Sequence, residues 1–181
     1  MKSLLLAVLA GLLVWASWSE EAVAAEPERV SFSVGSVDVL ADGPSFLDFG
    51  IGVFDVNGEG NDQRSAAAQI EYRFGQKLFF VGPAIGIMAN TDGGVFGYGG
   101  FYGDLAYQNF VATPVLALGG YKQGGSKDLG GIFQFRVGLG LMYRFEDGSR
   151  LGLRVNHISN ASIHEENRGE EEILLTYSLP F

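Results

Sequence analysis

A long run of strictly alternating side chains is the sequence feature that most constrains this fold. Between Phe133 and Phe145 every second residue is aromatic or aliphatic, and the positions between them hold Gln, Arg, Gly or Met. A period of two indicates a β-strand, and thirteen residues exceed the usual globular strand of about five or six. A shorter alternation follows from Ala66 to Phe74. Such strands are typical of a transmembrane β-barrel whose apolar face meets lipid, but a soluble barrel with its apolar face inward has the same period.

Three features favour the membrane barrel. Tyr and Phe recur near the strand ends, as an interfacial aromatic girdle requires, and the chain finishes in Tyr177–Phe181, which resembles the C-terminal signal of bacterial outer-membrane barrels. Short turns also alternate with longer polar loops, which is the outer-membrane pattern. The short turns lie near Gly75-Gln76, near Gln108-Asn109 and at Glu146–Ser149; the loops lie at Asn57–Arg64, Lys122–Gly131 and Asn160–Glu170, with a smaller one at Asn90–Gly94.

The alternation predicts an all-β, eight-stranded antiparallel transmembrane β-barrel over residues 48–181. An even number of strands returns both ends of the barrel to the periplasmic side, and eight strands leave an interior that side chains fill, so no channel is expected. Val30–Leu40 is a further strand candidate, which we interpret as part of a periplasmic extension over residues 26–47. The eight expected strands are Asp48–Val56, Ser65–Phe74, Leu78–Ala89, Val95–Tyr107, Phe110–Tyr121, Ile132–Phe145, Arg150–Ser159 and Glu171–Leu179.

The first 25 residues are predicted to be a signal peptide. Lys2 supplies a positive n-region, Leu4–Trp15 is apolar, and Ala22-Val23-Ala24 has the small-x-small pattern that signal peptidase cleaves. A membrane-spanning helix needs about 20 apolar residues, so the run is too short for an anchor. The chain is therefore expected to be exported to the bacterial outer membrane.

Composition excludes several function classes. With 21 acidic against 12 basic residues and a net charge of −9, the chain lacks the basic face that a nucleic-acid partner requires. The absence of Cys excludes a disulfide scaffold, thiolate metal ligands and thiol catalysis.

Both histidines lie close together near the end of one predicted strand. Residues two apart share a strand face, so His157 and Ser159 continue the apolar row of Leu151, Leu153 and Val155 at its loop end. Glu171 begins the apolar row of the next strand, and an antiparallel hairpin places it beside His157 on the outer surface. Glu170 and Glu172 point to the opposite face. Polar groups at the edge of a lipid-facing surface are costly and tend to be functional.

These three side chains have the composition of a hydrolytic triad. A serine hydroxyl needs a base to take its proton, and the base needs a third group to fix its tautomer. Ser159, His157 and Glu171 fit these roles, with hydrogen bonds of about 2.6–3.2 Å expected between them. Asn160 and nearby backbone N–H groups are candidate oxyanion donors. From the spacing alone, a hydrogen-bonded rim histidine remains an alternative.

The run His157-Ile158-Ser159-Asn160-Ala161, followed by Asn167-x-Gly169-x-Glu171, resembles the lipid A 3-O-deacylase family. The resemblance is specific over about Phe133–Phe181 and only architectural over Asp48–Gln123. It implies an outer-membrane esterase that removes the 3-hydroxyacyl chain at position 3 of lipid A, without a metal or other cofactor. It also implies Ser159 as nucleophile, His157 as general base and Glu171 as the residue that orients it.

The resemblance further places Asn160, Ser162 and Asn167 on the oxyanion and substrate-binding side. Ser162 is a departure, because the best-known members carry Gly there; we expect altered geometry rather than lost activity. The implied partners are lipopolysaccharide and outer-membrane lipids, which reach an outer-wall site by lateral diffusion. Two alternatives remain: a non-catalytic structural or adhesive barrel, and an outer-membrane phospholipase. The acidic residues Glu165, Glu166, Glu170 and Glu172 are expected to form a hydrated face.

Overall fold

The computed structural model describes residues 27–58 and 64–181, all of whose regular elements are strands. The predicted signal peptide, residues 1–25, lies outside the described residues. Nowhere in these two ranges does a helix have the length and apolarity to cross a membrane.

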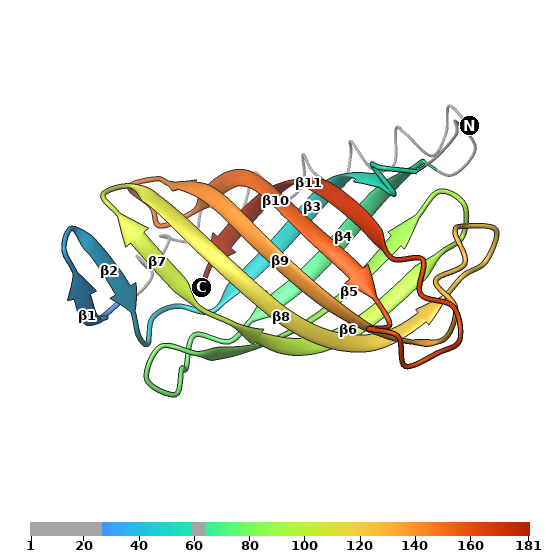
Figure 1. The fold of residues 1–181 in the computed structure, drawn as a ribbon. Helices are drawn as coiled ribbons and strands as arrows, with labels where there is room; N and C mark the ends of the chain where they lie inside the picture. The colour runs from blue at the N-terminus through green and yellow to red at the C-terminus, as the bar shows by residue number, and fades with distance from the viewer. Residues whose placement is uncertain (1–26, 59–63) are drawn as a thin grey trace, which may run out of the picture.

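The strands form one antiparallel sheet that closes on itself (Figure 1). β11 pairs with β3, and β8 pairs with both β6 and β9, which closes the barrel. The wall has eight strand positions, because β6 and β7 both pair with β8 and share one position, and the β1–β2 hairpin lies outside the closed ring. The predicted eight-stranded antiparallel barrel is confirmed. The bounds are β1 Val30–Val34, β2 Val37–Leu40, β3 Phe46–Phe54, β4 Ser65–Arg73, β5 Gly82–Asn90, β6 Val95–Tyr102, β7 Asp104–Tyr107, β8 Phe110–Lys122, β9 Phe133–Arg144, β10 Arg150–Ser159 and β11 Glu170–Pro180.

The structure differs from the expected strands at three places, one of which is Gly103, where the expected strand Val95–Tyr107 divides into β6 and β7. The expected strand Leu78–Ala89 begins only at Gly82, as β5. Leu78 and Val81 exchange backbone hydrogen bonds of 2.9 and 3.1 Å and close a tight turn before it. Residues 30–40 are not one strand: Gly35, with φ of 62°, reverses the chain and makes a β1–β2 hairpin that pairs with β7. Leu78–Val81 is a continuous apolar run, so the alternation gives no sign of its turn, whereas Gly35-Ser36 shifts the apolar positions from Val30, Phe32 and Val34 to Val37 and Val39.

The barrel turns its apolar side outward and its charged side inward. On the outer wall Leu139, Leu141 and Leu153 are each more than half exposed. Inside, Arg73 Nε lies 2.7 Å from Asp48 Oδ2, and other buried arginines and carboxylates form a continuous network. This arrangement is that of a transmembrane barrel and the inverse of a soluble one, which resolves the ambiguity of the alternation.

The two rims of the barrel differ. One rim, which we call the long-loop rim, carries the connections 55–64, 91–94, 123–132 and 160–169. The other rim carries the turns after β4, β7 and β9. At the second rim, which we call the short-turn rim, Glu28 forms ion pairs with Arg144, at 2.9 Å, and with Arg150. The segment before the barrel is thereby fixed to the short-turn rim.

Candidate active site

His157 and Glu171 lie side by side on the outer wall at the long-loop rim. They are register partners of β10 and β11, and His157 Nδ1 lies 3.2 Å from Glu171 Oε1. The side chains are 47% and 37% exposed, so both face outward. A proton on Nδ1 that is donated to this carboxylate leaves Nε2 as the ring nitrogen able to accept another proton.

The neighbouring glutamates point into the barrel, as the alternation predicts. Glu172 is fully buried, forms an ion pair with Arg136 and accepts a hydrogen bond of 2.8 Å from Asn156 Nδ2. Glu170 is also fully buried and accepts the backbone N–H of Asp55 at 3.1 Å. The expectation that Glu170 and Glu172 belong to a hydrated face is therefore wrong, because the register turns both side chains inward.

Ser159 is the last residue of β10 and shares the outward face with His157. It is half-buried beside its register partner Phe135 of β9. In the described part of the chain no hydrogen bond joins Ser159 to His157, so the expected contact between these side chains is absent from this conformation. Catalytic hydrogen bonds are often long before substrate binds.

Asn160 does not present its side chain to the outer surface. Its residue is fully buried, and Nδ2 donates to the carbonyls of Leu129 at 2.9 Å and Glu166 at 2.6 Å. Its Oδ1 accepts the Ser162 N–H at 2.9 Å. The Asn160 side chain thus ties two long loops together, which corrects the expectation that it donates to an oxyanion.

The turn after Ser159 holds two residues in the left-handed backbone region. Ala161 and Ser162 have φ of 51° and 62°, and the Ile163 N–H bonds the Asn160 carbonyl at 3.0 Å. Residues with side chains rarely adopt this conformation, and it concentrates at functional sites. Asn167 is exposed, and its Oδ1 accepts the Asn160 N–H at 3.1 Å. Asn167 and Ser162 therefore lie on the loop beside Ser159.

Gly169 is a site residue that the sequence reasoning did not single out. It has φ of 55°, and a Cβ at this position would lie 3.0 Å from His157 Cε1. The Gly169 backbone therefore packs against the edge of the imidazole. Its place between Asn167 and Glu171 in the family motif was the available signal.

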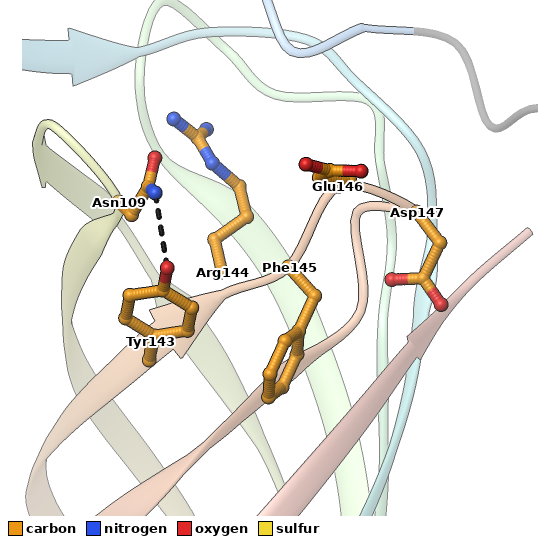
Figure 2. A pocket seen from close by; sticks show the side chains of 6 residues that line it. All are labelled: Asn109, Tyr143, Arg144, Phe145, Glu146 and Asp147. Carbon is orange, nitrogen blue, oxygen red and sulfur yellow. Dashed lines mark hydrogen bonds between the residues drawn. The ribbon is translucent and has the colours of Figure 1, made fainter.

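A separate hollow of about 530 Å³ lies at the short-turn rim (Figure 2). There Asn109 Nδ2 donates to the Tyr143 hydroxyl at 3.2 Å, beside Arg144 and the acidic Glu146 and Asp147. The lining has no nucleophile–base pair, and the hollow lies at the rim opposite His157. It is therefore not part of the candidate active site. Within residues 27–58 and 64–181, no group of three or more His, Asp or Glu side chains is arranged to hold a metal ion.

The fold and the site define a small β-barrel with an apolar outer wall that carries serine, histidine and glutamate side chains at one rim. The sequence matches the model of the lipid A 3-O-deacylase (PagL) family over residues 13–180, and the chain belongs to this family. The resemblance carried by the His157 and Asn167 motifs is therefore confirmed.

Two individual proteins illustrate this relationship. The lipid A deacylase PagL of Bordetella bronchiseptica (strain ATCC BAA-588 / NCTC 13252 / RB50) is 42% identical over 55 residues, which are 30% of this chain and 31% of that protein. The crystal structure of the outer membrane enzyme PagL superposes with a TM-score of 0.57 at 16% identity, covering 75% of this chain and 99% of the other. At this identity the superposition supports the shared fold alone.

Proposed function

We propose that this chain is a serine esterase of the bacterial outer membrane that hydrolyses the 3-O-linked 3-hydroxyacyl ester of lipid A. The observation that carries the proposal is the His157–Glu171 pair, with a 3.2 Å contact, on the apolar outer wall beside Ser159. Family membership supports the substrate, since the family is described as lipid A 3-O-deacylase.

Each side chain has one role in this mechanism. Ser159 Oγ attacks the ester carbonyl while His157 Nε2 takes its proton. His157 then gives that proton to the departing sugar oxygen, which leaves as the 3-hydroxyl group. Glu171 holds the imidazole through Nδ1 and stabilises the imidazolium that forms. Water releases the 3-hydroxy fatty acid from the acyl-enzyme by the same steps. Because no hydrogen bond joins the two side chains in this conformation, the reaction needs Ser159 Oγ to approach His157 Nε2 when substrate binds.

The oxyanion of the tetrahedral intermediate needs nearby hydrogen-bond donors. The N–H groups of Asn160 and Ser162 are already bonded to side-chain oxygens. The Ala161 N–H makes no hydrogen bond within residues 27–58 and 64–181, and Asn167 Nδ2 likewise donates none there. We assign these two groups as the oxyanion donors, in place of the Asn160 side chain.

The location of the site suits a lipid substrate. Lipid A lies in the outer leaflet, where the ends of barrel strands that carry long loops are expected to lie. A site on the outer wall receives the ester by lateral diffusion, with the sugar at the headgroup level and the acyl chains along the apolar wall. Residues 1–25 act as the export signal. The segment expected over residues 26–47 remains on the periplasmic side up to residue 45, because β3 of the barrel begins at Phe46.

The test is to incubate the refolded mature protein with lipopolysaccharide and to measure free 3-hydroxy fatty acid by mass spectrometry. Wild type is expected to release it, whereas Ser159→Ala and His157→Ala release at least about a hundredfold less. Equal release by wild type and Ser159→Ala would exclude the triad. Preferential release from phospholipid vesicles would assign a phospholipase instead.

A further inference from the structure

Glu170 is a buried carboxyl group that the proposed mechanism does not use. It is the first residue of β11, and its side chain points into the barrel interior at the long-loop rim. Its Oε2 accepts the Asp55 N–H at 3.1 Å, whereas its Oε1 has no hydrogen-bond partner within residues 27–58 and 64–181. Buried polar atoms are seldom left without a partner, so this carboxyl group needs a physical explanation.

The charges at this end of the interior leave Glu170 without a counter-ion. Lys127 Nζ lies 2.7 Å from Asp55 Oδ1, and Arg136 forms an ion pair with Glu172. Among the described residues Glu170 itself forms no ion pair. Two cations therefore face three carboxyl groups, and each cation is already paired with one of the other two.

A proton on Glu170 balances this set of charges. A carboxyl group that is buried without a cation favours its neutral form, and a second carboxylate close by on the same strand face adds to that preference. Glu172 is that second carboxylate, and its Oε2 is also buried without a partner in the described ranges, so it is available to accept the Glu170 O–H. The Tyr121 hydroxyl is a further titratable group near Glu170, but it donates to the Lys127 carbonyl at 3.0 Å.

The Glu170 side chain lies on the inner side of the wall that carries the candidate active site. Its register partner in β10 is Ile158, which directly follows His157, and Glu171 is the next residue of its own strand. On the other side of β11, the Val56 N–H donates to the Glu171 carbonyl at 2.8 Å. The start of β11, which carries Glu171, is thus held between β3 and β10 at the position of Glu170.

The contact with Asp55 shows how an ionised Glu170 would disturb the site. β3 ends at Phe54, and Asp55 has a φ of 57°, so the chain turns away from the sheet there and the Asp55 N–H bonds the Glu170 carboxyl group instead. A carboxylate that has lost its proton is stabilised by water, and the nearest water lies beyond the rim. Movement of Glu170 toward the rim breaks its bond to Asp55 and displaces the adjacent Glu171 from His157.

We propose that Glu170 is a positioning residue of the esterase site, which holds Glu171 against His157 only while its own carboxyl group is protonated. The proposal rests on the esterase function proposed above. Glu170 does not touch the substrate or the reacting atoms, and it acts through the position of Glu171.

Two substitutions of Glu170 test the positioning role. Glu170→Ala removes the acceptor of the Asp55 N–H and should lower kcat on lipopolysaccharide about a hundredfold, as a displacement of about 1 Å does. KM should change little, because the outer wall that meets the lipid is unaltered. Glu170→Gln is neutral and keeps both an acceptor and a donor, so it should restore the wild-type rate at neutral pH.

The pH profile tests the proton. Buried glutamates lose their proton at a pH of about 8–9, and above that range wild-type release of fatty acid should fall about tenfold per pH unit, because one proton is lost from the active form. Glu170→Gln should show no such fall. The matched control is Glu165→Gln, which removes the same charge from an exposed position of the neighbouring loop and should fall like wild type. Lys127 and Tyr121 are present in all three proteins, and the Ser159→Ala rate at each pH corrects for alkaline hydrolysis of the ester.

Infrared spectroscopy detects the same proton without catalysis. At neutral pH, wild type and Glu165→Gln in detergent micelles should show the C=O stretch of a protonated carboxyl group, and Glu170→Gln should lack it. Absence of this band from wild type, its persistence in Glu170→Gln, or an alkaline fall in Glu170→Gln like that of wild type would overturn the proposal. If Ser159→Ala releases fatty acid like wild type, the esterase proposal fails and the positioning role with it, whereas the infrared band still decides whether Glu170 holds a proton.

Discussion

His157 and Glu171 are opposite each other in the register of β10 and β11, and their side chains meet at 3.2 Å on the outer surface. The same register turns the adjacent Glu172 into the barrel, where it pairs with Arg136. Three consecutive glutamates are thus divided between an outward site and an inward network by the two-residue period of the strand. We therefore expect substitution of Glu171 to affect activity and substitution of Glu172 to affect stability.

Glu171→Gln should lower ester hydrolysis about a hundredfold or more while the barrel remains folded, because the imidazole loses the carboxylate that stabilises its charged form. Glu172→Gln should instead lower the stability of the barrel. It leaves Arg136 as a buried charge without its ion-pair partner, at a cost of about 3–5 kcal/mol in the free energy of unfolding. The measurements are hydrolysis rates and the temperature at which the folded band is lost in SDS gels. Equal unfolding temperatures for the two variants would contradict the assignment.

Gly169→Ala should lower the rate of ester hydrolysis, and this loss should exceed that of a variant that is destabilised equally elsewhere in the barrel. The new Cβ comes within 3.0 Å of His157 Cε1 and displaces the imidazole. Gly148→Ala is the matched control: its φ of 80° imposes similar backbone strain, but its Cβ meets only Pro180, at 3.4 Å. Both variants should lose about 1 kcal/mol of stability, and only the first should lose activity. If Gly169→Ala and Gly148→Ala lose activity equally, Gly169 does not position the His157 imidazole.

Asn160→Ala should loosen the loop that follows Ser159. The substitution leaves the Leu129 and Glu166 carbonyls and the Ser162 N–H without their partner. The cost is about 1–3 kcal/mol for the buried Leu129 carbonyl and less for the other two groups, which belong to exposed residues. Asn167→Ala removes one hydrogen bond, at an exposed residue, and should have a smaller effect. Amide hydrogen exchange over residues 160–169 measures the difference. If exchange in that loop is as slow in Asn160→Ala as in wild type, Asn160 is not the residue that holds it.

Ser162→Gly should stabilise the protein by about 1 kcal/mol, because glycine adopts positive φ without the steric cost that a Cβ imposes. Ser162→Ala retains the Cβ and should leave stability near that of wild type. Both variants keep the backbone N–H that bonds Asn160 Oδ1 and should retain hydrolysis. Thermal unfolding in detergent micelles is the measurement, and equal midpoints for the two variants would show that the φ of 62° carries no strain.

Single cysteines test the proposed orientation in the outer membrane, since the chain has none of its own. Glu165→Cys lies in the long loop after β10, and Glu146→Cys lies in the short turn after β9; both positions are exposed. In intact cells, a membrane-impermeant thiol reagent should label position 165 and should label position 146 only after the outer membrane is permeabilised. The reverse pattern would place the site on the periplasmic side.

Much of the barrel follows from the local sequence. The alternation from Phe133 to Phe145 fixes which side chains face outward, because a strand has a period of two whatever its neighbours. For the same reason the outward direction of His157 and Ser159, and the inward direction of Glu172, were predictable. The turn at Leu78–Val81 was not, since apolar residues there satisfy the alternation as well as a strand does.

Other features depended on contacts between distant segments. His157 lies opposite Glu171 only in one register of β10 and β11, and the hairpin pairs with β7 only in one arrangement of the sheet. Asn160 is buried against Leu129 because two long loops pack together. A side-chain pattern specifies a face but not the neighbour opposite it, because any even shift in register preserves the face. The sequence by itself therefore determined most of the strands and the direction of their side chains, whereas the closed sheet decided which residues meet at the site.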